Sequence, residues 1–285
     1  MKRGARLGIA LLGVGLILAA ISPLRERFFG RRRLRFPYLG RPLDAAIYAK
    51  LAAQPGWAKA GLEVAPGITL RGLLRRPSLA TAPWVLFYPG NDASQLERGQ
   101  AFLNRLAHDT DWGLAVFAYR GYDASSGTSE LASMRADAPR LLAGLCATER
   151  VPPARVHLIG FSIGGHFAVH AAGGANRTGA RAATLTLLAA VDDIVMYKPG
   201  PWETLSLGED YQTRPFLVDV PAPVLVLQGT ADEALAGPGQ GRDLAKALAE
   251  RGTYRELNGV KHLTLLEDQT ALDTIRAFVR AHSEP

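Results

Sequence analysis

After residue 42, short runs of consecutive apolar residues alternate with longer amphipathic stretches. A run that is apolar at every position is typical of a strand buried on both faces, and this pattern predicts strands at 84–88, 114–119, 156–161, 183–190 and 224–228. Two further strands are expected within 62–74, around the turn Pro66-Gly67, and a shorter one at 254–259. The amphipathic stretches predict helices at 94–108, 130–148, 163–174, 239–251 and 264–281.

This alternation indicates the α/β class, with a mostly parallel sheet that helices cover on both faces. The stretch 192–220 interrupts the pattern, because it is irregular and contains several prolines and aromatic residues. It is too short for a domain, so we expect a short insertion over one edge of the sheet. The body of the protein is therefore expected to be one domain over 43–285.

The N-terminal part of the chain has a different pattern. Residues 7–24 carry no charge, and as a helix they would be roughly 27 Å long, close to the thickness of the apolar core of a bilayer. Basic residues stand on both sides of this segment. We therefore predict that 1–42 is a membrane anchor with basic flanks and that the protein is a single-pass membrane protein. A cleaved signal peptide is the alternative, and the flanking charges leave undecided on which side of the membrane the body of the protein lies.

The composition changes the picture in one respect. The formal charge of +7 would suit nucleic-acid binding, but the basic residues are concentrated in 1–42, where ten basic residues and one acid give +9. The remaining 23 basic and 25 acidic residues give −2, and they form no basic stripe, so we expect no nucleic-acid partner. The single cysteine, Cys146, excludes a disulfide within the chain and a zinc site built from several thiolates.

A candidate nucleophile lies between a predicted strand and a predicted helix. Residues 160–165 read Gly-Phe-Ser-Ile-Gly-Gly, which matches G-x-S-x-G in the strand–turn–helix context that this pattern requires. Glycines at 160 and 164 leave room for a sharp turn that exposes the Ser162 hydroxyl. The same turn leaves the N–H of Ile163 at a helix N-terminus, where it can donate to the oxygen of an attacked carbonyl group.

A serine nucleophile needs a base and a carboxylate that orients the base, in the chain order Ser, Asp or Glu, His. His262 lies in a loop before the last predicted helix, and Asp232 follows the strand 224–228, so these two are predicted as base and acid. Glu233 and the pair Asp192 and Asp193 are the alternatives for the acid. The second oxyanion donor is predicted in the loop after strand 84–88, with the N–H of Asn91 as the best candidate.

Three segments resemble the α/β-hydrolase fold serine hydrolases, over about residues 60–282. They are the Gly-x-Ser-x-Gly-Gly turn, the stretch 119–127 (Tyr-Arg-Gly-Tyr-Asp-Ala-Ser-Ser-Gly), and the pair 228–232 and 259–262. The branch that they resemble includes membrane-anchored acyl-protein and lipid hydrolases and serine-aminopeptidase-like enzymes. The resemblance implies a sheet of about eight strands, the second of them antiparallel, and catalysis by Ser162, Asp232 and His262.

Three positions depart from the pattern of that branch. Pro89 stands where the family has histidine, Asp123 where it has glycine, and Gln228 where it has the histidine before the acid. None of these is a triad position, but Pro89 and Asp123 are expected to alter the floor of the pocket.

The sequence therefore predicts a serine hydrolase that cleaves esters or thioesters of a small-molecule or lipid-like acyl substrate, without a cofactor or metal. His166 and His170 have the spacing of a metal-binding pair, but a packed helix face explains them better because no third ligand is evident. The aromatic residues Tyr197, Trp202 and Tyr211 are candidates either to line an acyl pocket or to pack the insertion.

Two alternative functions remain open. An aminopeptidase-like amide hydrolase would need an acidic site for the amine of its substrate, and the candidates are Asp123, Glu203, Glu209 and Asp210. A hydrolase-like binding protein without turnover would have no use for a complete triad.

Overall fold

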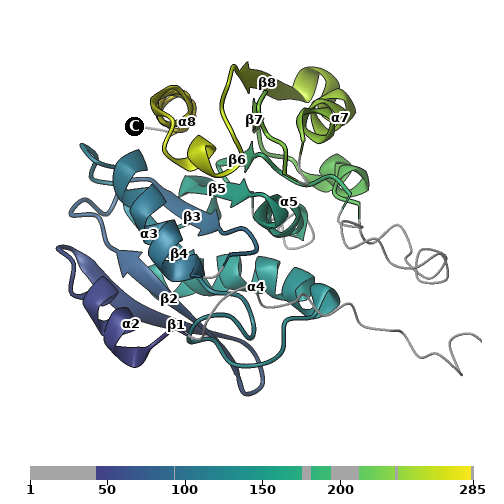
Figure 1. The fold of residues 1–285 in the computed structure, drawn as a ribbon. Coiled ribbons are helices and arrows are strands. Elements are labelled where there is room, and N and C mark those ends of the chain that lie inside the picture. The colour runs from purple at the N-terminus through teal and green to yellow at the C-terminus, as the bar shows by residue number, and fades with distance from the viewer. Residues whose placement is uncertain (1–42, 93, 175–180, 194–211, 235–236, 284–285) are drawn as a thin grey trace, which may run out of the picture. The chain divides into compact units, whose positions relative to one another are not determined.

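The computed structural model describes residues 43–92, 94–174, 181–193, 212–234 and 237–283. They form an eight-stranded sheet in the order β1-β2-β4-β3-β5-β6-β7-β8 (Figure 1). The strands are β1 (Trp57–Ala65), β2 (Ile68–Arg75), β3 (Trp84–Tyr88), β4 (Gly113–Phe117), β5 (Val156–Phe161), β6 (Thr184–Leu188), β7 (Val224–Gly229) and β8 (Gly252–Leu257). Strand β2 is antiparallel to β1 and β4, and the strands from β4 to β8 are parallel to one another. The predicted α/β class and the topology implied by the resemblance are confirmed.

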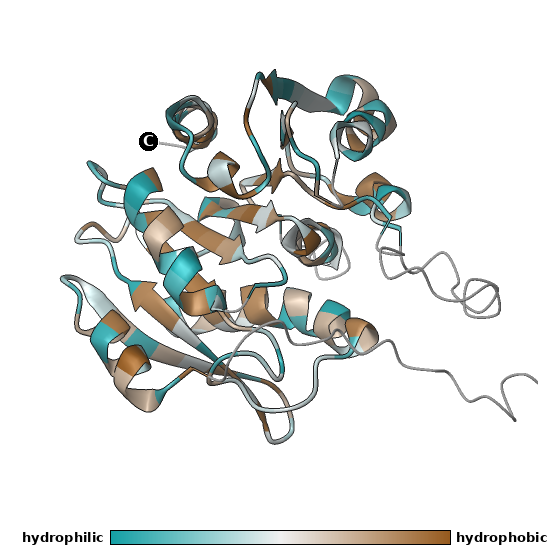
Figure 2. Cartoon of the chain, viewed as in Figure 1, coloured by the Kyte–Doolittle hydropathy of each residue, from teal (hydrophilic) through white to brown (hydrophobic). Residues whose placement is uncertain are grey.

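Helices cover both faces of this sheet. The six α-helices among the described residues are α2 (Ala45–Ala52), α3 (Gln95–Leu106), α4 (Leu131–Glu149), α5 (Ile163–Gly174), α7 (Pro238–Leu248) and α8 (Gln269–Ala281). Helices α2, α3 and α8 lie on one face, and α4, α5 and α7 lie on the other (Figure 1). Strands β3 to β7 are buried at every residue because both of their faces are covered, and they carry the most hydrophobic residues of the sheet (Figure 2).

One predicted helix is divided in the structure, and one helix of the structure was not predicted. The stretch 264–281 was expected to be one helix, but it is a 3₁₀ turn, η6 (Leu263–Leu266), followed by α8. The break occurs because the side chain of Asp268 accepts from the N–H of Ala271 and so starts a new helix. Helix α2 was not predicted. The side chain of Asp44 caps its start, and Tyr48 attaches it to the sheet by donating to the carbonyl oxygen of Gly72.

The predicted location in a membrane is corrected. Within the ranges that the structure describes, no helix has both the length and the apolar character needed to cross a bilayer, and this contradicts the single-pass location. The prediction rested on residues 7–24 and their basic flanks, which lie outside the described residues. The domain boundary at residue 42 stays a prediction.

Candidate active site

Ser162 occupies a strained turn between β5 and α5. Its φ angle is 55°, in the left-handed region that a residue with a Cβ rarely adopts. Three backbone hydrogen bonds hold the turn: the N–H of Ser162 donates to Leu188 O at 2.9 Å, and its carbonyl oxygen accepts from Gly165 N at 3.0 Å and from Val191 N at 3.2 Å. The strain is thus maintained by the surrounding sheet and helix, as in functional sites generally.

Two glycines make this turn possible. A Cβ on Gly164 would lie 2.0 Å from the carbonyl oxygen of Tyr88, at the end of β3. A Cβ on Gly160 would lie 2.5 Å from the carbonyl oxygen of Gly164. Any larger residue would therefore force the strand and the helix apart, which explains the glycine positions of the motif.

Asp232 and His262 are in direct contact. The Nδ1 atom of His262 lies 2.9 Å from Oδ2 of Asp232, whose side chain is fully buried. Because an ionised carboxylate can only accept, Nδ1 is the donor and Nε2 is left as the basic nitrogen. The imidazole keeps 17% of its surface exposed, so it remains accessible to a substrate.

Further contacts secure the acid. Oδ2 of Asp232 also accepts from Nε2 of Gln228 at 2.9 Å, and Oδ1 accepts from Ala234 N at 3.0 Å. The loop that carries Asp232 is joined to the loop that carries His262, because Ala231 N donates to Val260 O at 3.1 Å. Gln228, one of the departures from the family pattern, thus supports the acid directly. Sequence reasoning missed this role, because a residue type before the acid does not reveal which way its side chain points.

The turn at Ser162 and the imidazole lie at the same edge of the sheet. Ser162, Asp232 and His262 follow the carboxyl ends of β5, β7 and β8, which are parallel strands. Phe161, the neighbour of Ser162, packs against the ring of His262 with 4.8 Å between the ring centroids. The arrangement is compatible with the predicted triad, and the catalytic roles of its members stay predictions.

The alternative acids have other positions. Asp192 is buried and forms an ion pair of 2.7 Å with Arg214, and it also accepts from Arg214 N. Glu233 is exposed beside Asp232. Among the described carboxylates, the hydrogen bond to His262 is made by Asp232, which favours Asp232 over Asp192 and Glu233.

The predicted oxyanion loop lies directly against Ser162. A Cβ on Gly90 would be 3.3 Å from the Cβ of Ser162, so glycine permits this close approach. Asn91 follows Gly90, and its Oδ1 accepts from the Tyr122 hydroxyl at 2.6 Å. Ile163 is the first residue of α5, and its N–H is one of the four that have no acceptor within the helix.

Residues from the end of β4 hold this loop in place. The Tyr119 hydroxyl donates to Pro89 O at 2.7 Å, and its backbone N–H donates to Oε1 of Gln95 at 2.9 Å. Gln95 in turn donates through Nε2 to Gly90 O at 3.0 Å. Buried side chains therefore bind the carbonyl groups of Pro89 and Gly90 in this loop.

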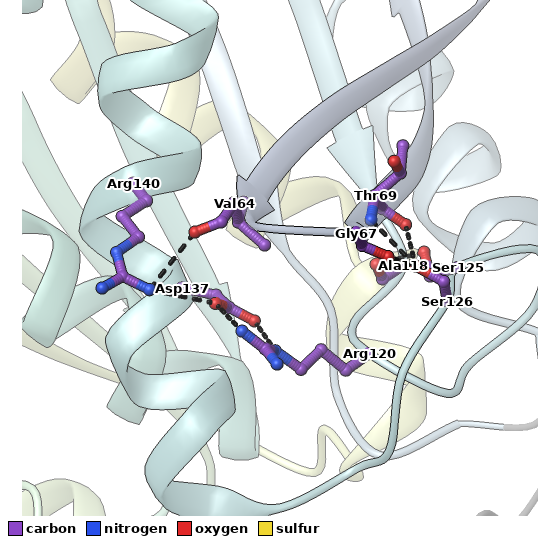
Figure 3. A network of polar contacts seen from close by, with 9 residues as sticks. All are labelled: Val64, Gly67, Thr69, Ala118, Arg120, Ser125, Ser126, Asp137 and Arg140. Atoms are coloured by element: carbon purple, nitrogen blue, oxygen red, sulfur yellow. Dashed lines mark hydrogen bonds and ion pairs between the residues drawn. The ribbon is translucent and has the colours of Figure 1, made fainter.

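The family-like stretch 119–127 is itself anchored at two places (Figure 3). Arg120 forms a bidentate ion pair with Asp137 of α4. On the other side, Ser125 and Ser126 accept from the backbone N–H groups of Arg71 and Thr69 in β2, each at 2.8 Å. The stretch 119–127 thus connects β2 and α4 to the predicted oxyanion loop, which it contacts through Tyr119 and Tyr122. Its residues therefore have a structural role.

Asp123 has a role that the sequence did not predict. It was expected to alter the pocket floor, but its Oδ2 accepts from Leu96 N at 2.8 Å and so caps the start of α3 from another segment of the chain. Its φ is 46°, and only 9% of the residue is exposed. Burial raises the pKa of Asp123 from 3.8 to about 6, the backbone N–H groups of Leu96 and Gln95 oppose this, and the charges of Asp92 and Glu97 add to it.

This carboxyl group makes stability depend on pH. Because the folded-state pKa is raised, its contribution is complete below pH 3.8 and is lost as the pH rises through about 6. Asp123→Asn keeps an acceptor for Leu96 without the charge, so we expect its free energy of unfolding, relative to the original protein, to rise by up to about 3 kcal/mol between pH 4 and pH 7.5. Urea unfolding at both pH values measures this. The exposed Asp243→Asn is the control, and a parallel pH dependence of the Asp123 variant and the original chain would contradict the prediction.

The two histidines of α5 pack against each other; His166 is fully buried and His170 is partly exposed. Nδ1 of His166 lies 3.2 Å from Oγ1 of Thr213, and its ring contacts that of His170 at 4.6 Å between centroids. Burial lowers the pKa of His166 well below its usual value, so it is neutral. In the described part of the chain, no three potential ligands gather as a metal site would require. Tyr197, Trp202, Glu203, Glu209, Asp210 and Tyr211 lie outside the described residues.

Comparison with known proteins gives relatives at low identity. No family model matches the chain. An uncharacterized protein of Mycobacterium tuberculosis, Rv2307c, is 28% identical over 278 residues, which are 95% of this chain and 92% of that protein.

Solved structures share the architecture of this chain at low sequence identity. An esterase of Pyrococcus furiosus superimposes with a TM-score of 0.64 at 12% identity, over 89% of this chain and 99% of the esterase. A puromycin-hydrolyzing peptidase of M. tuberculosis superimposes with a TM-score of 0.59 at 18% identity, over 80% of this chain and 39% of the peptidase. An esterase and a peptidase thus share this architecture, so the architecture alone does not select the bond that is cleaved.

Proposed function

Because the chain has the α/β-hydrolase fold, we propose that it is a serine hydrolase that cleaves carboxylic ester or thioester bonds with Ser162, His262 and Asp232. The observation that carries this proposal is the contact of 2.9 Å between His262 and the buried Asp232, at the sheet edge where the strained Ser162 turn lies. A scaffold without turnover would have no use for such a strained serine, which argues against a purely binding role.

In the proposed reaction, Oγ of Ser162 attacks the acyl carbonyl carbon while Nε2 of His262 takes the hydroxyl proton. The N–H groups of Ile163 and Asn91 donate to the oxyanion of the tetrahedral intermediate. When this intermediate collapses, the bond to the leaving group breaks and His262 gives its proton to the leaving oxygen or sulfur. A water molecule, deprotonated by His262, then attacks the acyl-enzyme; the bond from the acyl carbon to Oγ breaks, and His262 returns its proton to Oγ of Ser162 as the acid leaves. Asp232 holds the imidazole in the required tautomer throughout and stabilises its charged form.

The contacts of Asp123 favour esters over aminoacyl amides. An aminopeptidase-like enzyme needs a carboxylate that is available to the amine of its substrate. Asp123 is the described member of the four candidates for that role, and it is buried at the start of α3 with its Oδ2 bound to Leu96 N. We therefore place ester or thioester hydrolysis first and amide hydrolysis second.

A paired substrate panel tests this order. p-Nitrophenyl esters of short and long acids, the corresponding acyl thioesters and aminoacyl p-nitroanilides are assayed with the purified full chain. We expect kcat/KM for the esters to exceed that for the anilides by at least about a hundredfold, because an ester carbonyl is more electrophilic and p-nitrophenolate is a better leaving group, and the described residues offer no site for the amine of the anilides that would compensate for this. Turnover of the anilides alone would replace this proposal by the aminopeptidase alternative. If no substrate is turned over and a fluorophosphonate probe does not label the protein, the hydrolase proposal is wrong.

A further inference from the structure

A groove runs beside the candidate active site, between α3 and the 3₁₀ turn η6. Its volume is about 350 Å³. Asp92 and Ser94, which closely follow the oxyanion candidate Asn91, line the groove. Leu263, the residue after His262, lines it as well. The groove is therefore bounded by the two loops that carry the proposed oxyanion donor and the proposed base.

The apolar side chain that this groove offers to a ligand is Leu263, which is 49% exposed. Phe102 and Leu266 also line the groove, but they are only 1% and 3% exposed and are already packed in the core. Leu263 follows His262 directly, so an apolar part of a substrate that reaches the proposed base can cover it.

Four of the five charged residues that line the groove form two ion pairs, Arg98 with Asp92 and Arg105 with Glu267 at 3.3 Å. The fifth is Glu97, which is exposed. Because both arginines already have carboxylate partners and Glu97 adds a negative charge, the groove favours an uncharged group over an anion. Its volume lies near the lower limit for ligand pockets, so the group is short.

The proposed chemistry decides which half of an ester this group belongs to. His262 must give its proton to the leaving oxygen, so that oxygen lies within hydrogen-bond reach of Nε2. The leaving group therefore extends past the loop of His262, where the groove begins. We propose that the groove between α3 and η6 binds the alcohol part of the substrate, which is a short, uncharged and apolar group; this rests on the proposed ester hydrolysis.

Two homologous series of esters test the groove. The first holds the acyl group constant as acetate and lengthens the alcohol from methyl to butyl, and the second holds the alcohol constant as ethyl and lengthens the acid. For the original protein, kcat/KM in the first series is expected to rise about fourfold for each added methylene. This ratio reports the steps up to release of the alcohol, which are the steps in which the groove is occupied.

Filling the groove should remove that rise. In Ala101→Phe, on the groove side of α3, the ratio of kcat/KM for butyl to methyl acetate is expected to fall about tenfold or more, while the dependence of kcat/KM on acid length in the second series keeps its slope. Ala101→Leu is a milder variant with the same expected direction, and Ala247→Phe, exposed on α7, is the matched control.

Each outcome has a defined meaning. An unchanged butyl-to-methyl ratio in both Ala101 variants would overturn the assignment of the groove. Flattening of the acid series in its place would also overturn it, because the groove would then hold the acyl group. If the original protein hydrolyses methyl acetate and ethyl esters but shows no rise along the alcohol series, the groove proposal fails and the proposed function stands. If it hydrolyses no ester at all, the proposed function fails, and the groove assignment with it.

Discussion

Ser162→Ala is expected to lower kcat for p-nitrophenyl ester hydrolysis by roughly 10⁴- to 10⁶-fold and to abolish covalent labelling by a fluorophosphonate. The reason is that the variant lacks the only atom that forms the acyl-enzyme, while the oxyanion donors at Ile163 and Asn91 and the substrate contacts remain. KM is expected to change little. Stopped-time assays at high enzyme concentration, together with gel-based detection of the probe, measure both effects.

The substitution leaves the backbone strain of the turn unchanged, because the Cβ of alanine at φ 55° meets the same steric conflict as that of serine. The thermal unfolding midpoint should therefore stay within a few degrees, which separates lost chemistry from lost structure. Ser133→Ala, a matched change in α4, should keep full activity and labelling. Equal labelling of the Ser162 variant and the original protein would show that another residue is the nucleophile.

Much of the fold could be predicted because its central parallel strands are buried at every position and are mostly apolar. Strands such as Val224–Gly229 are covered by helices on both sides, so their sequence shows no alternation and is easily distinguished from the amphipathic helices. Local capping was harder to predict. The helical periodicity runs through Asp268, and only the hydrogen bond to Ala271 N reveals that a new helix begins there.

In the candidate site, too, the features set by local sequence could be predicted, and those set by side-chain contacts could not. Ser162 was predicted because the turn needs glycines at defined distances along the chain, and these requirements are local. The roles of Gln228 and Asp123 could not be predicted, since the first depends on a side-chain direction and the second on a contact with Leu96, 27 residues away. The membrane location was inferred from the length and apolar character of 7–24 and from its basic flanks, and the described residues contain no helix that could cross a bilayer, which contradicts it.

The second large effect is expected for Asp232→Asn, with a loss of roughly 10⁴-fold in kcat. Oδ2 of Asp232 accepts from both His262 Nδ1 and Gln228 Nε2, and Oδ1 accepts from Ala234 N. An amide has one oxygen, so its NH₂ group would face either Ala234 N or both His262 and Gln228. In the second orientation the ring of His262 adopts the other tautomer, with its proton on Nε2, and can no longer take the proton of Ser162.

The kinetics of this variant also discriminate between the acids that the sequence left open. Asp192→Asn changes an equally buried carboxylate that is paired with Arg214, so it should lower stability and keep activity within about tenfold. The rate of fluorophosphonate labelling should follow the same order, since it depends on the same proton transfer from Ser162. A larger loss for Asp192→Asn than for Asp232→Asn, in protein that unfolds cooperatively, would move the acid to the end of β6. Because the contact to His262 is made by Asp232, we expect the opposite order, and the size of the difference measures how much that one hydrogen bond contributes to the base.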